Sequence, residues 1–146
     1  MSQLWDEVVV AAKEAGAVAL DAQDLSRLVD AIYRRYLKSP ASSWWWSSLK
    51  VPIGTLEYGD RDGLAIVMSI LPEQDDLTLV VTNESVRPLG AVRGSAMQLR
   101  GVIANCPFFE FAIVPANLEW IVFDTHHNAL VGAGRLEALA SLDVPP

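Results

Sequence analysis

The sequence contains 146 residues, of which 51% are hydrophobic, and its formal net charge is −7. Residues 1–146 fit one globular domain that buries a core without disulfides, and the hydrophobic content argues against disorder. The negative charge argues against nucleic acid as a partner, because phosphates repel an acidic surface, and it is consistent both with a basic protein partner and with plain solubility.

The cysteine content and the N-terminal segment indicate a cellular location. Cys106 is the single cysteine, so no internal disulfide forms, and a reducing cytoplasm is the expected compartment. The N-terminal segment is acidic and lacks the basic region of a signal peptide. No apolar run approaches the length that crosses a bilayer. We therefore expect a cytoplasmic protein that does not associate with membranes.

The chain begins with two predicted helices. Apolar residues at helical spacing predict a helix over 4–19, which Gly16 ends or weakens. A longer apolar stripe predicts a second helix over 21–38. Asp24 favours its start and basic residues fill its last turn, as the helix dipole prefers, and Ser39-Pro40 ends it.

Three successive tryptophans, Trp44, Trp45 and Trp46, follow the second helix. They cannot all face one core in any regular structure, so at least one should be partly exposed. One interpretation is a hydrophobic plug that closes one end of a sheet. The other is an aromatic contact surface for a protein partner or a sugar ring, because tryptophan is enriched at interfaces.

The middle of the chain alternates apolar runs with polar turns. A strand is predicted over 51–58, and the polar turn 59–63 lacks the remaining ligands of a calcium loop. The apolar run 64–71 is consistent with a strand or a buried helix. Residues 77–82 read as a strand, which would pair with 64–71 as a hairpin if that run is extended.

A loop containing proline and glycine is predicted over 83–94. Ser95 then looks like the N-cap of a helix over 96–104. The segment Asn105-Cys106-Pro107 ends this helix and leads into the last third of the chain.

A hairpin is predicted over the aromatic and β-branched residues that follow. Its strands are 108–114 and 118–125, joined by a turn at 115–117. Because side chains alternate across a strand, the residues of the second strand divide between two faces. One face holds Trp120, Val122, Asp124 and His126; the other holds Ile121, Phe123, Thr125 and His127. Both faces begin apolar, which predicts a central strand covered on two sides.

A short strand over 129–131, ended by the glycines of 132–134, and a short helix over 135–142 complete the chain. The strands are grouped rather than alternating with helices. We therefore predict an α+β fold with a mainly antiparallel sheet of about five strands, two N-terminal helices, one helix before the last hairpin and a short C-terminal helix.

The polar end of the hairpin, Asp124 to Asn128, holds both histidines of the protein. Adjacent residues on a strand point opposite ways, so the two histidines do not readily bind one metal. A metal alternative would combine Glu110, Asp124 and His126, but zinc needs three or four ligands at recognisable spacing. Hydrogen bonds that close the turn are the simpler interpretation, and we expect neither a metal nor a cofactor.

An acid–base pair of Asp124 with His126 or His127 is also conceivable. No nucleophile is marked in the sequence, and Cys106 beside a proline and an apolar stretch is expected to be an inert thiol. The glycines form neither a phosphate loop nor a dinucleotide fingerprint. The sequence therefore favours a protein that is not an enzyme.

Four segments of the chain resemble parts of a known group of proteins. They are Phe109-Glu110-Phe111, Trp120-Ile121-Val122, Asp124–Asn128, and the strand with its glycine loop, VVTNESVRPLGAVRG. This part of the chain, 77–134, resembles small uncharacterised bacterial α+β proteins. Their last strand and turn follow the pattern Trp-aliphatic-aliphatic-x-acid-x-His-His-Asn/Asp. The resemblance implies company with small acidic immunity-like proteins of bacterial toxin systems, and it assigns no catalytic role to the histidines.

Three hypotheses follow. The leading one is a protein-binding module that neutralises or scaffolds a partner such as a basic toxin. Its expected binding residues are Trp44, Trp45, Trp46, Asp124, His126, His127 and Asn128. The second is a small hydrolase or metal-dependent enzyme that uses Asp124, His126 and His127, with Glu110 beside them. The third is a structural homodimer formed through the aromatic surface.

Overall fold

The computed structural model describes residues 3–38, 45–71, 76–82, 87–125 and 127–136. The helices are α1 (Gln3–Ala15), α2 (Ala22–Tyr36), α3 (Gly63–Ile70) and α4 (Ala96–Ala104), with a 3₁₀ turn, η1 (Trp45–Ser47). The strands are β1 (Val18–Ala19), β2 (Ile53–Glu57), β3 (Leu77–Val81), β4 (Gly90–Gly94), β5 (Phe111–Pro115), β6 (Trp120–Asp124) and β7 (Ala129–Gly134).

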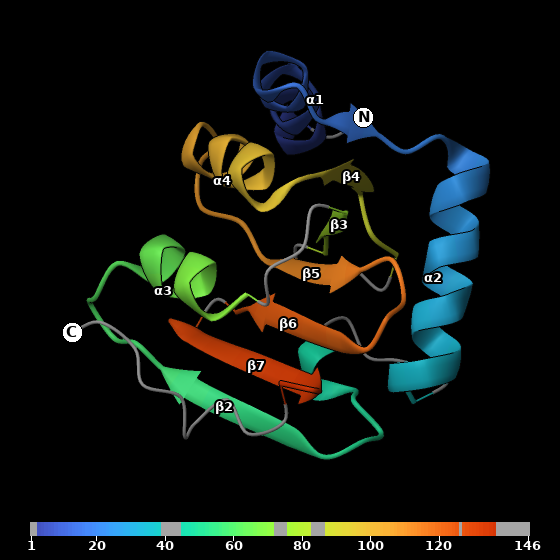
Figure 1. Ribbon diagram of the computed structural model, residues 1–146, viewed down its shortest axis with the longest axis vertical. Coiled ribbons are helices and arrows are strands. Elements are labelled where there is room, and N and C mark those ends of the chain that lie inside the picture. The colour runs from blue at the N-terminus through green and yellow to red at the C-terminus, as the bar shows by residue number, and fades with distance from the viewer. Residues whose placement is uncertain (1–2, 39–44, 72–75, 83–86, 126, 137–146) are drawn as a thin grey trace.

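The described strands form one antiparallel sheet in the order β1-β4-β3-β5-β6-β7-β2. The predicted α+β class is confirmed, but the described sheet has seven strands rather than about five. Figure 1 shows α1, α3 and α4 on one side of the sheet and α2 on the other. In the described part of the chain, no helix is long and apolar enough to cross a membrane.

Strand β6 lies inside the sheet, between β5 and β7, and all five of its residues are buried. Trp120 and Val122 belong to the core beneath α1, α3 and α4, whereas Ile121 and Phe123 belong to the core beneath α2. The prediction of a central strand covered on both sides is therefore confirmed. Its alternation places Asp124 on the α3–α4 side of the sheet.

The structure defines the ends of the two N-terminal helices. The first helix ends at Ala15, so Gly16 ends it as expected, and Val18–Ala19 of the predicted range pair with β4 instead. Asp24 lies in the first turn of the second helix, as expected, and Asp21 is the N-cap: the Asp21 carboxylate accepts a hydrogen bond of 2.8 Å from the backbone N–H of Asp24. This is the usual N-cap geometry, which satisfies one free N–H of the first turn.

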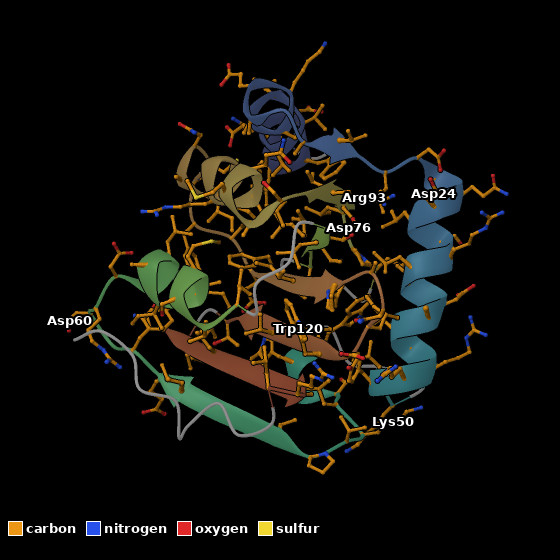
Figure 2. The ribbon with its side chains drawn as sticks, in the orientation of Figure 1. Asp24, Lys50, Asp60, Asp76, Arg93 and Trp120 are labelled. Carbon is orange, nitrogen blue, oxygen red and sulfur yellow. The ribbon has the colours of Figure 1, made fainter. Side chains whose placement is uncertain are left out.

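The run 64–71 is a helix, one of its two predicted alternatives, so the hairpin with 77–82 that depended on an extended run is not formed. Asp62 caps α3 by accepting a hydrogen bond of 3.1 Å from Ala65 N–H, and α3 buries Ile66 and Val67. Strand β3 pairs instead with β4 and β5. The loop predicted over 83–94 contains strand β4, because pairing with β1 and β3 outweighs the weak strand preference of its glycines. Figure 2 shows Arg93 of β4 beside Asp76, whose carboxylate accepts two of its hydrogen bonds.

The later elements agree more closely with prediction. Helix α4 occupies 96–104 as expected, and Ser95 forms a capping box with Gln98. Strand β5 begins at 111 rather than 108 and includes Pro115. Strand β7 extends to 134 rather than 131, because Gly132 pairs with both β6 and β2 and Gly134 pairs with β6. The helix predicted over 135–142 lies largely outside the described residues.

Candidate functional site

A cleft of about 400 Å³ lies between the start of α3 and the end of α4, and we call it the Asp124 cleft. It is lined by Tyr58, Gly59, Asp60, Arg61, Gly63, Leu64, Ile103, Cys106, Pro107, Phe108, Phe109, Phe111, Asp124 and Asn128. Four segments that are distant in sequence meet here: the end of β2 with the turn after it, the end of α4, the β5 strand and the β6–β7 turn. Figure 2 shows Asp60 at the outer end of this region, beside α3.

Asp124 is the most perturbed acid of the cleft. It is 6% exposed, and its Oδ1 accepts a hydrogen bond of 2.7 Å from the Tyr58 hydroxyl. Burial raises the pKa of Asp124 from 3.8 to about 6; the Tyr58 hydrogen bond lowers this pKa and the charge of Glu110 raises it. Burial dominates because removing an ion from water costs more than one hydrogen bond returns. The carboxyl group therefore changes its charge near neutral pH.

The local sequence holds Tyr58 against Asp124. The Tyr58 N–H donates to the Asn128 carbonyl at 3.0 Å, which ties the end of β2 to the β6–β7 turn. Gly63 gives room to the phenol ring, because a Cβ there would lie 2.7 Å from the Tyr58 ring. Burial raises the pKa of Tyr58 well above its ordinary value, and Asp124 adds to the effect. Tyr58 therefore remains a hydrogen-bond donor throughout the physiological pH range.

Two other charged side chains lie in or near the Asp124 cleft. Arg61 lines the cleft, and its guanidinium donates to the backbone carbonyls of Glu57 and Tyr58 at 2.8 and 3.1 Å. Glu110 is buried just before β5, at 3% exposure, and it does not line the cleft. These contacts leave Asp124 as the buried acid that the cleft presents.

Cys106 also lines the Asp124 cleft, half-buried. Burial, and then the negative charge of Glu7, raise the pKa of its thiol. Because the thiolate is the reactive form, the site does not activate this cysteine as a nucleophile.

The opposite face of the sheet holds a second pocket, of about 250 Å³, which we call the Trp46 pocket. It is lined by Trp46, Ser47, Leu49, Ile53, Thr55, Thr125, His127, Ala129 and Val131. The rings of Trp46 and His127 meet edge to face with centroids 5.6 Å apart. Two residues predicted as binding residues from distant parts of the sequence are thus neighbours.

The turn from Asp124 to Asn128 therefore serves two sites. Asp124 and Asn128 line the Asp124 cleft, and Thr125 and His127 line the Trp46 pocket. Within the turn, Thr125 Oγ1 donates to the Ala129 carbonyl at 3.0 Å and accepts from the His127 N–H at 3.2 Å. Asp124 and His127, which were predicted as neighbours in one site, thus line different pockets.

The tryptophans have different environments. Trp45 is 1% exposed and packs edge to face on Tyr33, so it is a core residue rather than a surface contact. Trp46 is half-buried and lines a pocket. This confirms the expectation that at least one tryptophan is partly exposed. Trp44 lies outside the described residues.

His126 also lies outside the described residues, and so does the metal alternative that includes it. Within the described part of the chain, no three His, Cys, Asp or Glu side chains cluster closely enough to hold a metal ion.

Sequence reasoning missed two prominent residues of the cleft. Tyr58 was predicted only as the end of a strand, and Phe108 as the start of another. In the structure Tyr58 binds Asp124, and Phe108 is 63% exposed at the cleft. No local pattern indicates a contact between residues 58 and 124. An aromatic residue before a polar turn was the available signal for Tyr58.

Comparison of this chain with protein-family profiles, with curated proteins and with solved structures found no match.

Proposed function

We propose that this protein is a cytoplasmic binding module that captures a protein partner at the Asp124 cleft, in the manner of an immunity protein that neutralises a toxin. The observation that carries the proposal is the pairing of a buried, ionisable carboxyl group with an exposed aromatic side chain in one cleft. Concave sites with a mostly apolar lining and a few placed polar groups are typical of binding sites.

Phe108 supplies the apolar anchor. It is a large aromatic side chain that remains 63% exposed although the chain buries most of its other aromatic residues. Covering a phenylalanine side chain contributes about 1.5–3 kcal/mol, and such anchors dominate the energetics of protein interfaces. A partner that covers Phe108 would therefore gain affinity directly from this residue.

The charge of the protein supports a basic partner. The net charge of −7 accelerates association with positively charged proteins and opposes association with acidic ones. The resemblance of 77–134 to small immunity-like proteins points to the same class of partner. A basic toxin domain is consistent with the exposed Phe108, with the net charge and with this resemblance.

The test is co-expression with the proteins encoded by the genes that flank this one, scoring growth and co-purification together. We expect one of them to inhibit growth, to be rescued by this protein and to co-purify with it. Phe108→Ala should weaken the complex at least tenfold, whereas Met97→Ala, which truncates a 73% exposed side chain outside the cleft, should leave it intact. An unchanged affinity for Phe108→Ala would reject the cleft as the binding site.

The same samples test the homodimer alternative. Light scattering of the purified protein alone gives its mass, and a homodimer would double the 15.9 kDa of the chain. If the protein is a dimer that Phe108→Ala dissociates, the surface binds a second copy and the proposal of a different partner is wrong.

A hydrolase is the second candidate, and the pKa of Asp124 favours it. A carboxyl group with a pKa of about 6 can exchange protons near neutral pH, as a general acid or base must. The test is hydrolysis of p-nitrophenyl esters with and without divalent metals. A rate above buffer that Asp124→Asn abolishes would support the enzyme, and a rate that this variant leaves unchanged would exclude Asp124 from it.

A further inference from the structure

A second groove, which we call the α1 groove, shares one lining residue with the Asp124 cleft. This groove has a volume of about 510 Å³ and is lined by Gln3, Asp6, Glu7, Val10, Ala11, Glu14, Asn105 and Pro107. Pro107 lines both the groove and the cleft. The segment between α4 and β5 therefore borders both hollows, which we call together the joined surface.

The joined surface is acidic. Its described lining residues include five carboxyl groups, from Asp6, Glu7, Glu14, Asp60 and Asp124, and one guanidinium group, from Arg61. Arg61 already donates to two backbone carbonyls, and no lysine or arginine lines the α1 groove. The negative charge of Glu7 reaches Cys106 inside the cleft, where it raises the pKa of the thiol. This effect adds to that of burial, and it shows that a charge of the α1 groove acts on a residue of the cleft.

The same surface also exposes two large apolar side chains to solvent, one from each hollow. Val10 of the α1 groove is 58% exposed, and Phe108 of the cleft is 63% exposed. Asp6, Val10 and Glu14 are spaced four residues apart, so they share one face of α1. A ligand that matches this surface combines positive charges with apolar side chains.

Asp124 provides a specific seat for one positive charge. Among the described residues, Tyr58 is its hydrogen-bond partner, and the bond uses Oδ1. A carboxylate accepts several hydrogen bonds, so Asp124 can accept further ones. Only 6% of its surface is exposed, and it lines the cleft. A lysine or arginine side chain would supply both the donors and the compensating charge.

We propose that the Asp124 cleft and the α1 groove form one docking surface for a basic, partly apolar segment of the partner protein, and that a lysine or arginine of this segment binds Asp124. This inference rests on the proposed function, because it names the chemistry that the partner must present. It commits to a protein segment because Phe108 and Val10 offer apolar contact beside the charges.

The experiment uses two synthetic peptides, one of alternating lysine and leucine and one of alternating glutamate and leucine. Each is titrated into the isotope-labelled protein at pH 7.5, and binding is followed by amide chemical shifts. We expect saturable shifts around Phe108, Asp124 and α1 with the lysine peptide and none with the glutamate peptide. Shifts spread over the whole surface, or centred on α2, would overturn the proposal.

A pair of charge-matched double variants separates this surface from simple charge attraction. Glu7→Gln with Glu14→Gln removes two acids of the α1 groove. Asp24→Asn with Asp30→Asn removes two exposed acids of α2, on the other face of the sheet, where Figure 2 labels Asp24. The first pair should weaken lysine-peptide binding by about threefold to tenfold, and the second should leave it unchanged. Equal effects of the two pairs would reject the docking surface.

Asp124→Asn tests the seat itself, with thermal unfolding as a check that the variant folds. It should weaken lysine-peptide binding at least tenfold at pH 7.5, whereas an unchanged affinity would exclude Asp124 as the seat. A protein encoded by a flanking gene could co-purify and be released by Phe108→Ala, while none of the acid variants changes peptide or partner binding. In that case the proposed function stands and this inference fails. If the lysine peptide binds as expected and no protein partner is found, the basic-segment chemistry is supported and the proposed partner is wrong.

Discussion

Asp124 makes the stability of this protein depend on pH in a way that one substitution can isolate. Asp124→Asn keeps a side-chain oxygen that can accept from the Tyr58 hydroxyl, but it cannot ionise. Burial raises the pKa of Asp124 from 3.8 to about 6 in the folded protein. Between these two values the folded chain binds a proton that the unfolded chain has released.

The sign of the effect follows from this proton. A raised folded-state pKa contributes stability that is fully present below the unfolded-state pKa and is lost as the pH rises through the folded-state pKa. Each pKa unit corresponds to about 1.4 kcal/mol, so the whole contribution is about 3 kcal/mol, of which about 2.4 kcal/mol is lost between pH 4 and pH 7. The wild type should therefore lose about this much free energy of unfolding relative to Asp124→Asn over that range.

The measurement is urea unfolding of both proteins at pH 4, 5, 6 and 7. Other titrating groups are common to both chains, so they cancel in the difference between the two free energies of unfolding. As the pH rises, the free energy of unfolding of Asp124→Asn should increase relative to that of the wild type. Half of this change should be reached between pH 4 and 6. A difference that is constant with pH would refute the buried, ionisable Asp124 on which the cleft is built.

Three further predictions concern the neighbours of Asp124 and the framework of the fold. Tyr58→Phe removes the hydrogen bond that lowers the pKa of Asp124, so NMR titration of the Asp124 carboxyl carbon should give a value above that of the wild type; a value at or below it would be contrary. Gly134→Ala should destabilise the protein by at least 2 kcal/mol more than Gly59→Ala in urea unfolding. Both residues have positive φ, but a Cβ at Gly134 would overlap the backbone carbonyl oxygen of Glu119, whereas nothing lies within 4 Å of a Cβ at Gly59. Ser95→Ala should cost about 1 kcal/mol by removing the capping box of α4, and no loss in the same assay would disprove the role of this cap.

Local chemistry made several elements predictable from the sequence. Helix α4 was located at both ends, because Ser95 is a strong N-cap and Asn105-Cys106-Pro107 cannot continue a helix. The two-sided burial of β6 followed from apolar residues at consecutive positions. Because side chains alternate across a strand, the sequence also assigned Asp124 and Thr125 to different faces of the sheet.

Elements with ambiguous local signals were decided by their partners. The apolar run 64–71 fits a strand or a helix, and the Asp62 cap together with one buried face made it α3. The glycine-containing segment 90–94 reads as a loop, yet β3 and β1 pair with its two edges. Backbone pairing of this kind depends on distant residues, so a local pattern cannot reveal it.

The sequence by itself determined the α+β class, the central hairpin and the polar turn at Asp124–Asn128, because each depends on the type and spacing of residues that are close in the chain. The tertiary structure alone decided what this turn contacts. It brought together Tyr58 and Asp124, which are 66 positions apart in the sequence, and Trp46 and His127, which are 81 positions apart. It also joined the end of α4 to the acidic face of α1. Long-range contacts of this kind depend on how the whole sheet assembles, and burial at their meeting point sets the pKa of Asp124 and the shape of the cleft.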